Sequence, residues 1–180
     1  LPRLDMYVDV MLKNNCRIAS KVLPQSAVLK LAQRSCRDSA RTPMQWTGGP
    51  WAGFSETRPW FYLNENYRDV NVEVEERDPD SLLNFYRELI AFRKAEPLVM
   101  EGEYKEHLRQ SPNFYVYSRE AGGRRLLVIC SFADKDTYFT APEGFDLMQG
   151  RLVLKNYEMN LVINNCFTAR PYELRVYLFE

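Results

Sequence analysis

The sequence of 180 residues has no apolar run that approaches the roughly 18 residues of a membrane span. It has no excess of charge either, because 24 basic residues balance 24 acidic ones. A strong excess of basic residues is the electrostatic signature of proteins that bind nucleic acids or anionic membranes. We therefore expect neither nucleic acid nor a membrane as a partner, and we place the protein in the cytoplasm.

Histidines and paired cysteines are also scarce. The only histidine is His107, and the four cysteines lie far apart without a Cys-x-x-Cys pair. A zinc site or a histidine relay would therefore lack its usual residues. We predict no metal and no cofactor, and we expect His107 to be a strand or loop residue without a catalytic role. The cysteines are expected to be reduced and mostly buried: Cys16, Cys36, Cys130 and Cys166.

Apolar residues at helical spacing predict three helices in the first half of the chain. The first spans residues 4–12, and a short second helix runs from Ser26 to Arg34. The clearest helix spans residues 79–95, with Asp78 as its cap and Pro97 preventing its continuation. Its predicted buried stripe consists of Leu82, Phe85, Tyr86, Leu89 and Phe92.

After Pro97 the apolar pattern changes from a helical period to alternation. Two strands, 113–120 and 124–132, are joined through a Gly-Gly turn that is typical of a hairpin. Further strands are predicted at 136–140, 151–157, 160–163 and 172–179, the last with alternating inward residues. Short strands separated by turns indicate an antiparallel sheet or sandwich. The preceding part has too few apolar stripes to close a core, and the sequence starts without Met, so we interpret the chain as a fragment.

A long loop, residues 36–77, lies between these regions and begins with RDSARTPMQW. Loops of this length in compact domains are usually functional or disordered, and its many aromatic residues argue against disorder. Aromatic rings and arginine forks suit sugars, which offer apolar CH faces and hydroxyl groups. The alternative is a packed structural loop in which Arg37 and Asp38 form an internal ion pair.

The block RDSARTPMQW, followed by AGF, PW, NENY and SLLNFYRELIAFRK, resembles the α-amylase superfamily of glycoside hydrolases. The similarity is to the oligo-1,6-glucosidase, α-glucosidase and trehalose-6-phosphate hydrolase group, and it covers nearly the whole chain. It implies a mixed α and β fold, in which the end of a (β/α)8 barrel precedes an antiparallel, β-sandwich-like C-terminal domain. Residues 1–96 would be the barrel remnant, with its long loop 36–77 and last helix 79–95, and residues 97–180 the β domain.

The resemblance also implies a function for the complete enzyme. Such enzymes cleave short α-linked glucosides by a retaining mechanism, which needs a carboxylate nucleophile and a carboxylic acid/base about 5 Å apart. The family motifs that carry these groups, one of them Asn-His-Asp, are absent from this sequence. We therefore assign no catalytic residue and expect the chain alone to be inactive.

One binding residue carries over from the resemblance. Arg41 matches the family arginine that reaches the glucose at the cleaved position, and Trp51 and Phe54 are candidates for the rim of the pocket. The sequence departs from the family at Thr47, which usually is Asp, at the GGPW segment, and at Glu65, which usually is Pro. These departures concern the geometry of the rim.

Two further interpretations remain open. The chain could be a standalone carbohydrate-binding or interaction module that uses its β part and aromatic loop. It could also be a non-enzymatic structural relative. The sequence that encodes residues upstream of Leu1 would discriminate among these, because the barrel motifs would have to lie there.

Overall fold

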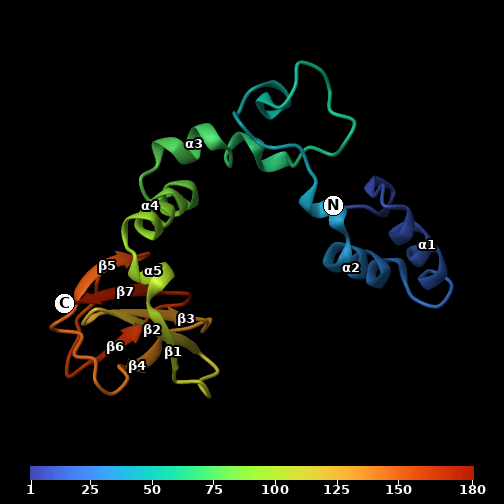
Figure 1. Ribbon diagram of the computed structural model, residues 1–180. Coiled ribbons are helices and arrows are strands. Elements are labelled where there is room, and N and C mark those ends of the chain that lie inside the picture. Colours follow the sequence, from blue (N-terminus) through green and yellow to red (C-terminus); the bar gives the residue numbers. More distant parts are fainter. The chain divides into compact units, whose positions relative to one another are not determined.

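A computed structural model describes residues 1–180, except for the side chain of Ser39. The chain divides into two compact units, Leu1–Asn84 and Phe85–Glu180. Figure 1 shows helices and an extended loop in the first unit and strands in most of the second. None of the described helices is long and apolar enough to cross a membrane.

The first long helix of the first unit begins just after two backbone N–H groups, those of Val8 and Asp9, that donate to the carboxylate of Asp38. The expected single helix over residues 4–12 is wrong, since the chain is extended around Tyr7 and a new helix starts after Asp9, whose carboxylate accepts from Leu12 N at 2.9 Å. The predicted helix Ser26–Arg34 is confirmed. The elements here are η1 (Leu4–Met6), α1 (Val10–Ala19) and α2 (Gln25–Ser35).

The long loop contains more regular structure than its sequence suggests. Asn71 caps a short helix by accepting from Val74 N at 3.0 Å. The next helix starts later than predicted, because Ser81 Oγ accepts from Asn84 N at 3.2 Å while Asp78 binds the N–H of Asp80. These elements are η2 (Arg37–Ala40), η3 (Pro50–Gly53), η4 (Glu65–Arg68), α3 (Val72–Arg77) and α4 (Leu82–Ala95).

The second unit is built on a five-stranded antiparallel sheet with the order β1-β2-β3-β7-β5, and β4 pairs with β6 in a second sheet. The strand predicted at 160–163 is absent, because Ile163 makes only an isolated bridge to Cys166, where β6 begins. The elements are α5 (Leu98–Glu101), β1 (Glu103–His107), β2 (Phe114–Ala121), β3 (Arg124–Ser131), β4 (Thr137–Thr140), β5 (Arg151–Lys155), β6 (Cys166–Ala169) and β7 (Leu174–Phe179).

Two hydrophobic clusters cover the two faces of the five-stranded sheet. In the first cluster Leu127 and Tyr177 of that sheet pack with Phe139 and Phe167 of the two-stranded sheet. In the second cluster Leu126, Val128, Leu154, Val176 and Leu178 pack with Leu98 of α5. The five successive residues 175–179 of β7 are all buried, so the alternation expected in the last strand does not separate a buried face from an exposed one.

The predicted buried stripe of α4 is only partly correct. Phe85, Leu89 and Phe92 pack against the second cluster. Leu82 and Tyr86 are instead 67% and 55% exposed.

Candidate functional site

The loop that carries the predicted site starts at a buried carboxylate. Asp38 is 1% exposed, and its Oδ2 accepts from Val8 N at 2.7 Å and from Asp9 N at 2.9 Å. Arg37 donates to Asp9 at 2.9 Å. The predicted ion pair between Arg37 and Asp38 is therefore wrong, because Asp38 turns inward to the backbone while the largely exposed Arg37 pairs with the cap of α1.

Electrostatics support this arrangement. The N–H of Leu12 and the guanidinium of Arg37 hold the pKa of Asp9 below its usual value, since both donate to the charged carboxylate. Burial raises the pKa of the neighbouring Cys36 thiol. Asp9, Cys36 and Asp38 place possible metal ligands within 4.8 Å of one another. Their bonds to Arg37 and to backbone N–H groups, and the raised thiol pKa, do not favour a cation there.

Arg41 lies at the end of the segment that begins with Arg37 and Asp38. Its N–H donates to Asp38 O at 3.1 Å, which fixes its backbone. Its side chain is exposed and makes no ion pair or hydrogen bond with a described side chain. The guanidinium thus keeps all five donors for another group.

The part of the loop that follows Arg41 is hydrogen-bonded to residues near the end of the same loop. Asn64 Nδ2 donates to Thr42 Oγ1 at 3.2 Å and to Gln45 Oε1 at 3.3 Å. The carbonyls of Gln45 and Trp46 accept from Val72 N and Glu73 N, both at 3.0 Å. The start of α3 therefore holds the segment that follows Arg41. The sequence carries a signal for the start of α3, because Asn71 is a preferred capping residue and acidic residues, Glu73 and Glu75, follow it in the first turn.

The aromatic part of the loop is a tight turn with left-handed backbone. The φ angles are 52° at Trp51, 59° at Ala52 and 65° at Gly53. Ala52 O accepts the N–H groups of Trp46 at 2.8 Å and of Thr47 at 3.0 Å. Such conformations cost roughly 1–2 kcal/mol at each non-glycine residue, so the surrounding bonds must hold them.

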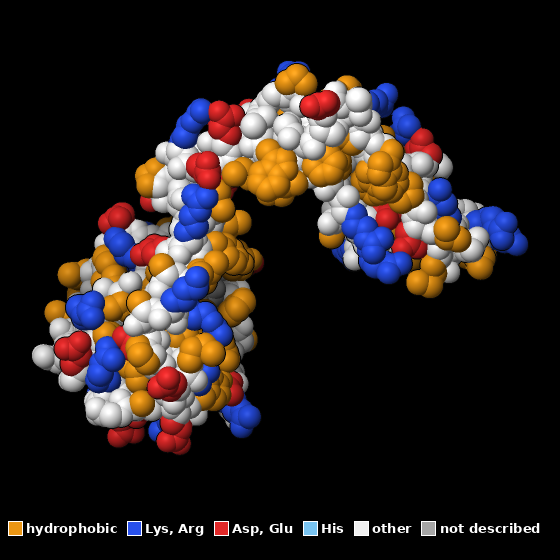
Figure 2. Space-filling model, turned by 45° about the horizontal axis from the view of Figure 1, so that its top comes forward, with side chains coloured by type: hydrophobic (Ala, Val, Ile, Leu, Met, Phe, Trp, Pro, Cys, Tyr) orange, Lys and Arg blue, Asp and Glu red, His pale blue; other side chains and the backbone are white. Residues whose placement is uncertain are grey.

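The turn presents aromatic residues to solvent. Trp51 is 37% exposed and Phe54 is 48% exposed. Hydrophobic side chains gather over the loop region between α2 and α3 in the space-filling view (Figure 2). The other large apolar residues of this loop that are exposed are Met44, Trp46, Trp60, Val70 and Val74.

The structure brings two of the three predicted residues together in one turn. Trp51 and Phe54 both belong to it, and Phe54 N donates to Trp51 O at 3.1 Å. Among the described residues, neither makes a direct ring or hydrogen-bond contact with Arg41. Thr47, where the family commonly has Asp, has a structural role here, because its Oγ1 accepts from Gly49 N at 3.2 Å.

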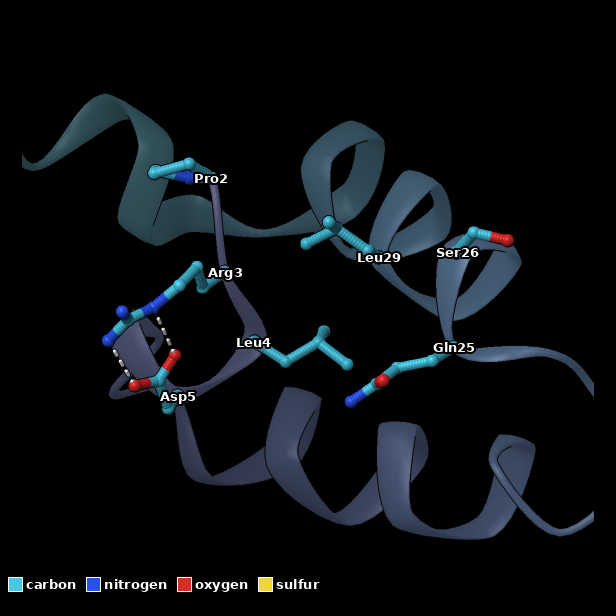
Figure 3. Close-up of a pocket in the computed structure, with 7 residues that line it drawn as sticks. All are labelled: Pro2, Arg3, Leu4, Asp5, Gln25, Ser26 and Leu29. Carbon is cyan, nitrogen blue, oxygen red and sulfur yellow. Dashed lines mark hydrogen bonds and ion pairs between the residues drawn. The ribbon is translucent and has the colours of Figure 1, made fainter.

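A separate hollow of about 650 Å³ lies between the N-terminal segment and α2 (Figure 3). Arg3 and Asp5 form an exposed ion pair of 2.6 Å at its edge. None of the predicted site residues lines it. Its lining residues are Pro2, Arg3, Leu4, Asp5, Gln25, Ser26 and Leu29.

Comparisons with known proteins give one consistent result. The family model described as "Alpha amylase, catalytic domain" matches residues 10–102. "Probable oligo-1,6-glucosidase 2" of Bacillus subtilis (strain 168) is 36% identical over 180 residues, which are 99% of this chain and 32% of the relative. "Trehalose-6-phosphate hydrolase" of the same strain is 34% identical over 159 residues, 87% of this chain and 28% of the relative.

Solved structures agree. Bacillus licheniformis trehalose-6-phosphate hydrolase superposes with a TM-score of 0.92 at 30% identity, over 99% of this chain and 33% of that one. Isomaltulose synthase from Klebsiella sp. LX3 gives a TM-score of 0.88 at 28% identity, over 99% of this chain and 32% of that one. The chain thus spans about a third of the length of these relatives.

The fold prediction is confirmed by these matches. The mixed α and β chain corresponds to the C-terminal part of such enzymes, in which the end of a barrel is followed by a β domain. The family model covers more than half of the chain. This protein therefore belongs to the alpha-amylase catalytic-domain family, as the resemblance of RDSARTPMQW and the later blocks predicts.

Proposed function

We propose that this chain forms the C-terminal third of an α-glucosidase-type glycoside hydrolase that cleaves short α-linked glucosides by a retaining mechanism. The observation that carries the proposal is the exposed, unpaired guanidinium of Arg41 on a loop tied at both ends, in a chain aligned almost entirely with oligo-1,6-glucosidases. Residues 1–96 are assigned to the barrel and residues 97–180 to the β domain.

In this proposal Arg41 contacts the glucose at the cleaved position. An arginine fork donates to two oxygens at once, either of a sugar or of a carboxylate that must be aimed at the sugar. The hydrogen bond from its N–H to Asp38 O fixes the backbone of Arg41, so the backbone loses little further conformational entropy when the side chain binds. Trp51 and Phe54 form a rim that offers ring faces to the apolar side of an outer sugar.

The reaction itself needs the two carboxylates of the retaining mechanism. No part of this sequence matches the family motifs that supply them. The chain contributes binding and loop geometry, and the nucleophile and acid/base belong to the preceding part of the catalytic domain in such enzymes.

A second candidate is a standalone carbohydrate-binding or interaction module. The observation in its favour is that both hydrophobic clusters lie in the second unit, which thus has a core of its own. A module needs only a folded platform and an exposed aromatic surface.

The test compares this chain with a chimera. The chimera joins the first two thirds of the Bacillus subtilis oligo-1,6-glucosidase 2 to Leu1 of this chain, and both proteins are assayed with p-nitrophenyl α-glucoside. We expect hydrolysis by the chimera and none by the chain alone. Turnover by the pure chain, or a folded chimera without turnover, would contradict the proposal. Sugar binding by the chain beside an inactive chimera would favour the binding module.

A further inference from the structure

The single histidine of the chain lies at the end of an edge strand. His107 is the last residue of β1, so the expected strand or loop position is confirmed, and its side chain is half-buried. Its Nε2 atom lies 3.0 Å from Ser118 Oγ of the neighbouring strand β2. Ser118 is 0% exposed, so its hydroxyl depends on partners within the protein. The ring of His107 is therefore held by a polar group that solvent does not reach.

The Ser118 hydroxyl determines which nitrogen of the histidine can take up a further proton. Ser118 Oγ donates to Glu120 Oε1 at 3.1 Å, and an ionised carboxylate can only accept. Because a hydroxyl has one hydrogen, Ser118 must accept from His107, and Nε2 carries the proton of the neutral ring. A second proton would bind at Nδ1, which forms no hydrogen bond with a described residue. The charged ring would therefore gain a donor without an acceptor in the protein.

The same ring packs against a segment that joins β4 to β5. The rings of His107 and Phe145 meet edge to face, with centroids 5.4 Å apart and planes at 82°. Phe145 is 5% exposed and belongs to the first hydrophobic cluster. Residues 141–149 around it form turns and irregular backbone, and we call them the Phe145 segment. His107 is thus one of the side chains that hold this segment on the sheet.

Other side chains fasten the Phe145 segment as well. Arg125 Nη1 donates to Gly144 O at 2.9 Å, and its guanidinium lies 4.7 Å from the centroid of the Phe145 ring. Asn165 Oδ1 accepts from Leu147 N at 2.8 Å. The segment forms no strand, so its opening does not require the strands of the sheet to separate.

The surroundings of His107 favour its neutral form. Burial lowers the pKa of His107 below 6.5, and the positive charge of Lys105 on the same strand lowers it further. Glu120 acts in the opposite direction, but its effect on the pKa is smaller. The other charged residues on this face of β1 and β3 and on the Phe145 segment are Glu103, Arg125, Glu143 and Asp146.

We propose that His107 is a pH-sensitive switch: its neutral ring holds the Phe145 segment on the sheet, and its protonation releases the segment. The charged ring would have to leave its contact with Phe145 or remain half-buried beside Lys105 with an unpaired Nδ1–H group. The pKa of His107 is lower with the segment closed than the ordinary value of 6.5. The stability that neutral His107 gives the closed segment is therefore present above pH 6.5 and is lost as the pH falls through the lower pKa.

Release of the segment would expose apolar side chains of the first cluster. Phe145 and Leu147 are 5% and 3% exposed in the closed segment. This inference concerns the second unit alone and does not rest on the proposed function.

The experiment follows the full chain by NMR and hydrogen exchange between about pH 5 and pH 8, the range in which histidine titrates. His107 is the only histidine, so the imidazole signals report its titration directly. The amide of Leu147 reports opening of the segment, because it is bonded to Asn165. We expect both to change with one midpoint below pH 6.5, and opening to rise about tenfold for each pKa unit between the closed and open states. The amide of Leu127 in β3 is the internal control, and its exchange should follow only the intrinsic pH dependence.

Replacement of the two neighbouring charges tests the direction of the effect. Lys105→Gln removes a cation and should move the midpoint to higher pH, whereas Glu120→Gln removes an anion and should move it to lower pH. Glu120→Gln retains an oxygen that can accept from Ser118. Lys94→Gln is the matched control, because Lys94 is exposed on α4, which packs on the opposite face of the sheet, and should leave the midpoint unchanged.

His107→Phe keeps an aromatic ring against Phe145 but cannot titrate, so exchange at Leu147 should follow only the intrinsic pH dependence. Its folding is checked by circular dichroism, and if it does not fold, the two charge variants decide the question. The proposal is overturned by a Leu147 amide that does not open in acid in the unchanged protein, or by the same opening in folded His107→Phe. Midpoints of Lys105→Gln and Glu120→Gln that coincide, or that move in the opposite directions, would also overturn it.

Discussion

Replacement of Asp38 should loosen the start of α1. The carboxylate accepts two backbone N–H groups, from Val8 at 2.7 Å and Asp9 at 2.9 Å, and is 1% exposed. Hydrogen bonds to a charged group contribute about 1.5–3 kcal/mol each, which gives roughly 3–6 kcal/mol for two. In the variant, water can reach the partly exposed N–H groups and replace part of this interaction. We therefore expect Asp38→Ala to lower the free energy of unfolding by about 2–4 kcal/mol.

The assay is hydrogen exchange of the Val8 and Asp9 amides together with thermal melting of the first unit. Asp38→Ala should speed exchange at both amides and lower the melting temperature. Asp38→Asn keeps an acceptor oxygen without the charge, so it should have a smaller effect of the same sign.

Asp5→Ala is the matched control. It removes another carboxylate of the first unit, but one whose ion pair with Arg3 is exposed on both sides. Exposed pairs contribute little to stability, so this variant should melt almost normally. Unchanged exchange at Val8 and Asp9 in Asp38→Ala would refute the assignment of Asp38 as the tie between the loop and α1.

Two further predictions concern a glycine and an ion pair. Gly53→Ala should lower the melting temperature more than Gly122→Ala. Both glycines have positive φ, but only at Gly53 would an added Cβ come close to another atom, Thr47 Oγ1 at 2.8 Å. Equal shifts of the melting temperature in the two variants would contradict this prediction. For Glu96, burial raises the pKa, but bonds from Arg124 and a backbone N–H outweigh it and lower the pKa below 4.5. The stabilisation that ionised Glu96 gives the folded state is therefore present above pH 4.5 and is lost as the pH falls through the lower pKa of the folded state. In that pH range the melting temperature of Glu96→Gln should depend less on pH than that of the unchanged protein.

The sequence predicts those elements whose stabilising contacts are local. Helix α2 and most of α4 follow from apolar spacing, and the β2–β3 hairpin follows from its Gly-Gly turn. Strand β1 has a charged sequence at the edge of the sheet, and it depends on pairing with β2. Nothing in its own residues distinguishes it from a loop.

Long-range bonds explain what the sequence does not reveal about the site. The carboxylate of Asp38 binds N–H groups about thirty residues earlier, which ends η1 and frees Arg37 to pair with Asp9. Adjacent opposite charges in a sequence suggest a pair, but side chains next to each other need not face one another. Arg41 was identifiable only through its family motif, because a single exposed arginine has no distinctive local pattern.

We propose that the long loop, residues 36–77, forms one wall of a glucoside site through Arg41. The most direct measurement is kcat/KM of the active chimera with Arg41→Lys, beside Arg37→Lys as the control. Loss of a charge-assisted hydrogen bond costs about 1.5–3 kcal/mol, or roughly ten- to a hundredfold in kcat/KM. We predict this loss for Arg41→Lys with little change in melting, and mainly a lower melting temperature for Arg37→Lys. Full activity of Arg41→Lys with reduced stability would contradict the account.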